Sequence, residues 1–297
     1  MLLIFISSSF IFSIDNFVFA MVPGFSIASA GDWGCSENTQ RTVSNILSRN
    51  ISLLLGLGDY SYRPTADCWQ DLINPLEPIT KIVIGNHDTR PRSLLNEYFN
   101  HFNLTNPFYS FNLYNVHFLV MSSETSFENS SEQYRFVNSD LEMASSDPRV
   151  DWIIVSFHRP AYTSPTHNEG DALLRDTYHP IFERYGVDMV LQGHNHNYQR
   201  TYPIKYNSTF SEDPIIENTG TFYYEDEPGI VFLTVGTGGQ SLYPLKSKAF
   251  YVANQFDTVY GYILIEVDNN HQTEKYLNVA FHDSYGTIRD QFSITKN

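Results

Sequence analysis

Five segments of this sequence contain side chains that can bind metal ions, and each segment directly follows a short apolar run. They are Gly31-Asp32-Trp33-Gly34, Gly58-Asp59-Tyr60-Ser61-Tyr62, Gly85-Asn86-His87-Asp88, His158 and Gly193-His194-Asn195-His196. Carboxylate, phenolate, amide and imidazole groups are hard to borderline ligands, which suit iron, manganese and zinc. Because no thiolate stands among them, a structural zinc site or an iron–sulfur cluster is disfavoured. The five segments together predict a metal site.

The number of these donors exceeds what one ion needs. Two ions about 3.5–4 Å apart that share one carboxylate would use all of them. Such a pair lowers the pKa of a bound water, binds phosphoryl oxygens and neutralises charge while the attacking and leaving oxygens pass in line. The residues therefore predict hydrolysis of phosphate esters.

The elements that must position these donors follow from the hydrophobic pattern. Short apolar runs alternate with longer polar-periodic segments, which is typical of βαβ units and a parallel sheet. The expected strands are Phe25–Ala30, Ile51–Leu57, Lys81–Ile84, Val116–Met121, Trp152–Phe157 and Val187–Leu191. The expected helices are Asn38–Ser48, Arg92–Phe102, Glu132–Ala144 and Asp171–Tyr185. Since the carboxyl ends of parallel strands share one edge, we expect the donors to meet in one pocket there.

The pattern changes after about residue 220. Strands joined by turns are expected at Gly229–Val235, Tyr260–Val267, Leu277–His282 and Gln291–Thr295, and they should form an antiparallel meander that completes a second sheet. Tyr202–Tyr224 is expected to be a long loop. The predicted fold is an α/β two-sheet β-sandwich flanked by helices, with a bimetal site at the carboxyl ends of the strands.

The five segments, in this order, resemble the purple acid phosphatases, a branch of the calcineurin-like metallophosphoesterases. Most members of the wider superfamily have Asp-x-His in the first segment and no tyrosine in the second. Here Gly34 replaces that histidine, and Tyr62 is positioned to supply the missing ligand. The resemblance implies a ferric ion, Fe(3+), held by Asp32, Tyr62 and His196. It implies one divalent ion (Fe, Zn or Mn) held by Asn86, His158 and His194, with Asp59 bridging the two ions.

The same resemblance implies roles for residues beside the ligands. His87 matches a histidine that contacts the substrate phosphate, and His167 matches one that protonates the leaving alkoxide. An imidazolium acid suits hydrolysis below neutral pH. Asp88 is expected to orient a ligand or His87. Tyr198 and Arg200 either line the pocket or simply pack within a strand.

The predicted function is hydrolysis of phosphomonoesters, with a metal-bound hydroxide as nucleophile. A phosphodiesterase or nucleotide hydrolase is the alternative, because the same core runs either reaction and specificity resides in loops such as Pro160–Asp171. A non-catalytic secreted protein that binds metal or phosphate is an alternative from another class. The expected partner is a small phosphorylated substrate. The formal net charge of -15 argues against nucleic acid and anionic membranes as partners.

The amino terminus resembles an export signal. The apolar run Leu2–Ile14 is too short to span a bilayer, and we expect residues 1–20 to be a signal peptide, with 21–297 as a small single catalytic domain. No Lys or Arg precedes the run, so an uncleaved anchor remains an alternative. A secreted or extracytoplasmic location allows glycosylation at Asn-x-Ser/Thr sites. It also allows a Cys35–Cys68 disulfide, the alternative being two unrelated buried thiols.

Overall fold

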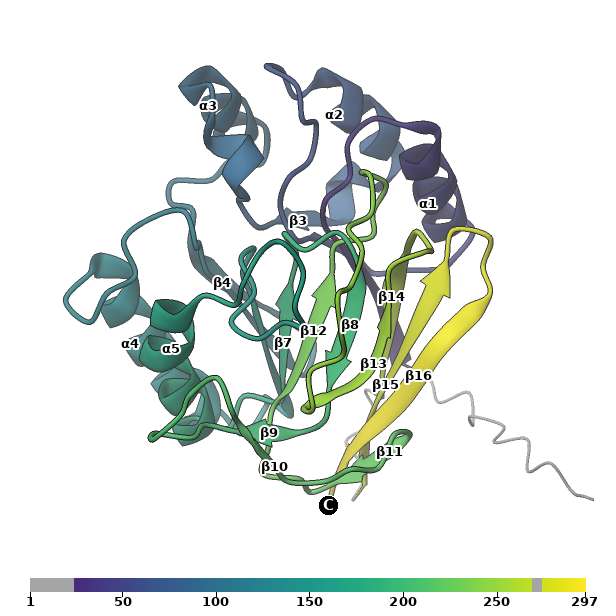
Figure 1. The fold of residues 1–297 in the computed structure, drawn as a ribbon. Helices are drawn as coiled ribbons and strands as arrows, with labels where there is room; N and C mark the ends of the chain where they lie inside the picture. Colours follow the sequence, from purple (N-terminus) through teal and green to yellow (C-terminus); the bar gives the residue numbers. More distant parts are fainter. Residues whose placement is uncertain (1–23, 269–273) are drawn as a thin grey trace, which may run out of the picture.

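The computed structural model of the chain describes residues 24–268 and 274–297 (Figure 1). The expected signal peptide, residues 1–20, lies outside the described residues. No helix within the described ranges is both long and apolar enough to cross a membrane.

Two seven-stranded sheets form the body of the molecule (Figure 1). The first has the order β11 (Tyr223–Glu225), β16 (Ile288–Lys296), β15 (Lys275–Asp283), β14 (Gly261–Asp268), β1 (Gly24–Ala30), β2 (Leu53–Gly56) and β3 (Thr80–Ile82). The second has the order β13 (Val252–Phe256), β8 (Tyr198–Thr201), β12 (Val231–Val235), β7 (Met189–Gln192), β6 (Trp152–Ser156), β5 (Val116–Val120) and β4 (Tyr109–Leu113). A separate two-stranded ribbon joins β9 (Ile204–Lys205) to β10 (Ile215–Ile216).

Helices cover both sheets (Figure 1). They are α1 (Glu37–Leu47), α2 (Asp67–Ile73), α3 (Arg92–His101), α4 (Glu132–Ser146) and α5 (Ala172–Arg184), with the 3₁₀ turns η1 (Asn74–Ile79) and η2 (Asn86–Thr89). The N-terminal caps explain where three of them begin. Ser36, Ser131 and Asp171 each accept a backbone N–H from the first turn of the helix that follows.

The central strands of the second sheet are buried on both faces, and in β7 and β12 alternate residues face different cores. In β7, Met189 and Leu191 join the core between the sheets, whereas Val190 joins the core under α4 and α5. Leu233 and Phe232 of β12 divide in the same way. This two-residue alternation explains why these strands are continuous apolar runs in the sequence.

Two expectations about the sheets were wrong. Val231–Val235 does not belong to the carboxyl-terminal meander but pairs in parallel with β7 and antiparallel with β8, and its residues divide between the same two cores as those of β7. The donor-bearing strands also do not share one sheet, since β1, β2 and β3 lie in the first sheet and β6 and β7 in the second. The meander of β14, β15 and β16 instead extends the first sheet through antiparallel pairing of β1 with β14.

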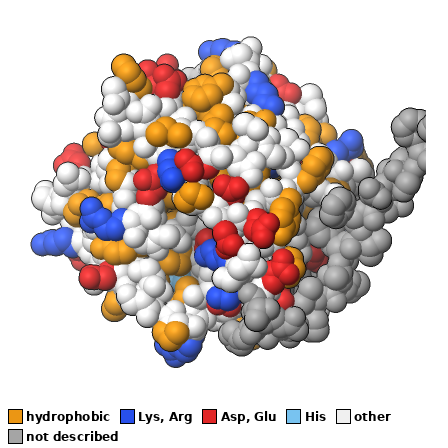
Figure 2. Space-filling model, turned by 90° about the horizontal axis from the view of Figure 1, so that it is seen from below, with side chains coloured by type: hydrophobic (Ala, Val, Ile, Leu, Met, Phe, Trp, Pro, Cys, Tyr) orange, Lys and Arg blue, Asp and Glu red, His pale blue; other side chains and the backbone are white. Residues whose placement is uncertain are grey.

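The expected helices all form within one or two residues of their predicted ends, and the Cys35–Cys68 disulfide is present. Helix α2 and strands β4, β9, β10, β11 and β13 were not predicted, and Tyr202–Tyr224, expected to be a loop, contains the β9–β10 ribbon. Strand β8 contains Tyr198 and Arg200, for which packing within a strand was one of the two alternatives. On the face seen in Figure 2, acidic, basic and hydrophobic side chains are interspersed.

Candidate metal centre

The carboxyl ends of strands from both sheets meet and bond to one another. His158 Nδ1, after β6, lies 2.8 Å from the Leu57 carbonyl, after β2. The His194 backbone N–H, after β7, donates to Asp32 Oδ2, after β1, at 2.7 Å. The donors therefore bridge the sandwich instead of lining the edge of one sheet.

Four of the predicted ligands have a left-handed backbone. The φ angles are 58° at Asp32, 57° at Asp59, 53° at Tyr62 and 67° at His194. This region is unfavourable for residues with a Cβ, and strained positions of this kind concentrate at functional sites. The strain turns the chain sharply at each strand end and directs the side chains into one place.

Gly58 shows how closely these turns approach one another. Its φ is 92°, and a Cβ there would lie 2.6 Å from His158 Nδ1 and 2.8 Å from the Gly85 nitrogen. Only glycine fits this position, because any side chain would separate the loops after β2, β3 and β6.

One group of donors surrounds the Tyr62 hydroxyl. Tyr62 Oη lies 2.9 Å from His196 Nε2, 3.2 Å from Asp32 Oδ1 and 3.3 Å from Asp59 Oδ2. His196 Nε2 lies 3.2 Å from Asp32 Oδ1. These are the residues that the resemblance assigned to the ferric ion, together with the assigned bridge.

A second group shares the same Asp59 oxygen. His158 Nε2 lies 3.3 Å from Asp59 Oδ2 and 3.2 Å from Asn86 Oδ1. One ligand atom each of Asp59, His158 and His194 lies within 4.8 Å of the others. Asp59 thus stands between the two groups, where a bridging carboxylate has to be.

Hydrogen bonds at Nδ1 fix two of the imidazoles. His158 Nδ1 faces the Leu57 carbonyl, and His196 Nδ1 lies 2.7 Å from the Ser241 carbonyl. Each leaves Nε2 facing the cluster, which is how proteins commonly orient histidine ligands. The Tyr243 ring also stacks on His196, with ring centroids 3.8 Å apart.

Ser241 and Tyr243 were not predicted from the sequence. They follow β12, whose carboxyl end joins the site as a sixth strand end, and Gly239 N donates to the Asp32 carbonyl at 3.2 Å. The signal was the glycine-rich segment 236–239 after an apolar run, but it contains no metal-binding side chain.

Asp88 supports the site from behind. Its carboxylate accepts the backbone N–H groups of Asp59 at 2.7 Å, Gly85 at 2.8 Å and Tyr60 at 3.0 Å. Its exposed fraction is 0%. Because substrate cannot reach it, Asp88 is a positioning residue that holds the loops after β2 and β3 together.

The two predicted substrate-facing histidines lie at the surface of the cluster. The His87 side chain is 50% exposed, its Nε2 is 4.0 Å from Asp59 Oδ2, and its ring packs on Tyr62 with centroids 4.4 Å apart. His167 is exposed, and its ring meets Tyr243 edge-on at 4.0 Å. Tyr243 therefore stands between His167 and His196.

Burial and charge together perturb the ionisation of the cluster. Burial, then the charges of Asp32 and Asp59, raise the pKa of Tyr62 far above its ordinary value. Burial alone would lower the pKa of His158, but Asp59 and Asp32 reverse the effect and raise it to about 10. Burial, His158 and Arg159 lower the pKa of His194 to about 3. Burial and the Asp59 charge raise the pKa of Asp88 to about 8.

These residues fit a pair of metal ions. Buried carboxylates crowd a phenol that burial keeps protonated, and the imidazoles present Nε2 to the same space. A cation would favour both the carboxylates and an ionised Tyr62. The donor set contains oxygen and nitrogen but no sulfur, which suits iron with iron, zinc or manganese.

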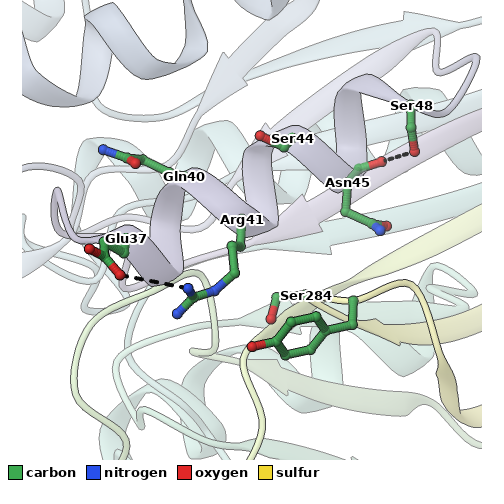
Figure 3. A pocket seen from close by; sticks show the side chains of 8 residues that line it. Glu37, Gln40, Arg41, Ser44, Asn45, Ser48 and Ser284 are labelled. Atoms are coloured by element: carbon green, nitrogen blue, oxygen red, sulfur yellow. Dashed lines mark hydrogen bonds and ion pairs between the residues drawn. The ribbon is translucent and has the colours of Figure 1, made fainter.

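Two other features lie apart from this cluster. Tyr198 and Arg200 are buried, and both donate to Asp290 Oδ2 of β16, so they do not line the site. A groove of about 570 Å³ between α1 and the β15–β16 turn is lined by Glu37, Arg41 and Tyr285, among others (Figure 3). It contains none of the predicted ligands.

The chain matches the family model described as calcineurin-like phosphoesterase over residues 25–198. Purple acid phosphatase 18 of Arabidopsis thaliana is 29% identical over 71% of this chain and 49% of its own length. Purple acid phosphatase 21 of the same plant is 29% identical over 76% of the chain and 53% of its length. The chain thus spans about half the length of these curated relatives.

A solved structure has the same fold. The purple acid phosphatase PPD1 from yellow lupin (Lupinus luteus) seeds superposes with a TM-score of 0.77, over 92% of this chain and 54% of the lupin chain, at 20% identity. The two-sheet sandwich with flanking helices is therefore a calcineurin-like metallophosphoesterase fold.

Proposed function

The chain belongs to the calcineurin-like phosphoesterase family, and from this premise we propose that it is an acid phosphatase that hydrolyses phosphomonoesters at a binuclear Fe(3+)–M(II) centre. The second metal is iron, zinc or manganese. The observation that carries the proposal is the position of Tyr62 Oη, which lies within 3.3 Å of Asp32, Asp59 and His196. A phenolate ligand among two carboxylates favours a hard trivalent ion.

The charges of the site support a phosphate substrate. When bound, the two ions would supply a water of lowered pKa and positive charge for the phosphoryl oxygens. Asp32, Tyr62 and His196 would hold the ferric ion, and Asn86, His158 and His194 the divalent ion. Asp59 would bridge them, because its Oδ2 faces both groups.

Two exposed histidines are proposed to act on the substrate itself. His87, half-exposed beside Tyr62, would contact the phosphate. His167, on the loop after β6, would give a proton to the leaving oxygen. Both side chains reach solvent, as groups that contact an incoming substrate must.

The test begins with the visible absorption spectrum of the purified, air-oxidised protein. We expect a broad purple band from tyrosinate bound to ferric iron. The band should disappear in Tyr62→Phe while the fold, followed by circular dichroism, is retained. Tyr262→Phe is the matched control, since Tyr262 is a buried tyrosine of β14 whose hydroxyl donates to Asn45 Oδ1 of α1 at 2.7 Å; this variant should keep the band.

Substrate preference is measured on the same preparation. We expect p-nitrophenyl phosphate to be hydrolysed at acid pH with a much higher kcat/KM than bis(p-nitrophenyl) phosphate. A colourless protein containing two metals per chain would refute the tyrosinate–iron assignment. A preference for the diester would instead refute the monoester assignment and favour a phosphodiesterase.

A further inference from the structure

A second cavity, of about 420 Å³, lies beside the loop that carries His167. It is lined by residues on both sides of His167, by the start of α5 and by parts of the segments around 212 and 246–251. Lys246 N donates to the Pro165 carbonyl at 2.9 Å, so the segment that carries Tyr243 borders the same loop. Unlike the groove of Figure 3, this cavity contains a charged side chain that is almost fully buried.

That side chain is Arg175, which is 7% exposed. Its Nε donates to Ser211 Oγ at 3.1 Å, its Nη1 donates to the Ala161 carbonyl at 3.0 Å, and the guanidinium lies 5.5 Å from the Tyr162 ring centroid. These contacts hold the planar group rigidly against the cavity. The carboxylate paired with it, Asp176, is 3.8 Å away and 46% exposed. A buried guanidinium with such weak compensation favours an anionic group beside it.

Three further charged side chains line the cavity: Lys246, Glu169 and Glu212. Within residues 24–268 and 274–297, none of the three has a counter-ion within 4.0 Å. The cavity is thus lined by two cationic and two anionic side chains that form no ion pairs with one another. This arrangement suits a ligand that carries both signs.

Two neutral polar side chains of the wall already have hydrogen-bond partners. Thr166 Oγ1 donates to the Asn168 carbonyl at 2.9 Å, and Tyr251 Oη donates to the Thr163 carbonyl at 2.9 Å. Recognition is therefore left mainly to the four charged side chains. A dianion would meet two carboxylates, and a simple cation would meet Arg175 and Lys246.

We propose that this cavity binds a small zwitterion of the free α-amino acid class. The carboxylate of the ligand is held by Arg175 and Lys246, and its ammonium group by Glu169 and Glu212. A guanidinium is well suited to bind a carboxylate through parallel hydrogen bonds. The cavity volume accommodates an amino acid together with its side chain. The lining of the cavity includes none of the predicted metal ligands.

The test uses the full metal-loaded chain. The common L-amino acids are screened at millimolar concentration for a rise in Tm, since a ligand that binds only the folded state stabilises it. The best one is titrated calorimetrically, beside its analogues lacking either the ammonium or the carboxylate group. We expect each analogue to bind about tenfold more weakly or worse, because one charge pair is lost.

Variants distinguish this cavity from chelation at the metal centre. Lys246→Gln and Glu212→Gln change exposed side chains that have no other partners in the described chain, and each should weaken binding about tenfold. Lys81→Gln, an exposed lysine on β3, is the control and should bind normally. The proposal is overturned if no amino acid raises the Tm, if a single-charge analogue binds as tightly, or if neither variant weakens binding. Because the readout is binding, an inactive or colourless protein leaves the result interpretable.

Discussion

The proposed role of His167 as the acid for the leaving group can be tested by mutation; the residue is exposed, and the ring of Tyr243 separates it from the predicted ligand His196. In His167→Ala we expect alkyl phosphates to lose roughly 10²–10⁴-fold in kcat. p-Nitrophenyl phosphate should lose far less, since its leaving group departs without a proton. The measurement is kcat against leaving-group pKa over a series of monoesters. An equal loss across the series would contradict the acid role.

At this scale the sequence predicted which side chains the structure brings together, but not the backbone groups that support them. The predicted ligands could be located because carboxylate, phenol and imidazole groups after strands have a recognisable pattern. The Ser241 carbonyl has no such pattern, since every residue has one. The role of Asp88 was also predicted only in outline, because its partners are the backbone N–H groups of two separate loops.

At the scale of elements, Asp88 joins the loop after β2 to the loop after β3. In the wild type both carboxylate oxygens of Asp88 accept backbone N–H groups. In Asp88→Asn an NH₂ group replaces one of these oxygens, and it cannot accept the backbone N–H that faces it. The Asp59 turn should therefore loosen, and metal affinity should fall by about 10–100-fold. Equilibrium dialysis against the divalent ion measures this change.

Asp140→Asn is the control for that variant. Asp140 is likewise buried and hydrogen-bonded, to His117 and Ser110, but it lies on α4 away from the ligands. It should leave metal affinity unchanged. Equal losses in both variants would mean that the effect comes from general destabilisation and not from the loop connection.

The strands themselves were predictable, and their assignment to sheets was not. Continuous apolar runs indicate strands that are buried on both faces, and this holds for β5, β6, β7 and β12. The same pattern cannot say which sheet a strand joins, because pairing depends on contacts between distant segments. Val231–Val235 was for that reason placed in the wrong sheet. Strand β8 could be given only as one alternative for Tyr198 and Arg200, because Tyr198-Gln199-Arg200-Thr201 is polar although fully buried.

At the scale of the whole molecule, Arg200 and Asp290 connect the two sheets. Arg200 of β8 donates to Asp290 of β16 through Nε at 2.6 Å and Nη2 at 2.9 Å, and Arg200 is 1% exposed. Asp290→Ala leaves this buried charge unpaired. The free energy of unfolding should fall by about 3–5 kcal/mol, measured by urea denaturation. Asp147→Ala, which breaks the surface pair with Arg149, should change it little.

The stability that the Arg200–Asp290 pair contributes depends on pH through the ionisation of Asp290. Burial opposes its charge, but the hydrogen bonds and charge of Arg200 outweigh burial and lower its pKa. A carboxyl group whose pKa is lower in the folded state stabilises the protein at any pH above its unfolded-state pKa. This stabilisation is lost as the pH falls through the folded-state pKa. The penalty in Asp290→Ala should thus be the same at pH 7 and pH 5 and shrink only below about pH 4. A penalty that already shrinks between pH 7 and pH 5 would contradict this account.

Ser241 and Tyr243 contact His196 but lie more than forty residues after it in the chain. This separation affects when the metal centre can be completed during synthesis. During synthesis Asp32 and Asp59 leave the ribosome early, whereas Ser241, whose carbonyl orients His196, leaves it much later. An unfinished chain therefore has several donors and no complete pair of binding sites. We therefore expect complete binding of both metal ions only late in synthesis, after the two sheets have packed together.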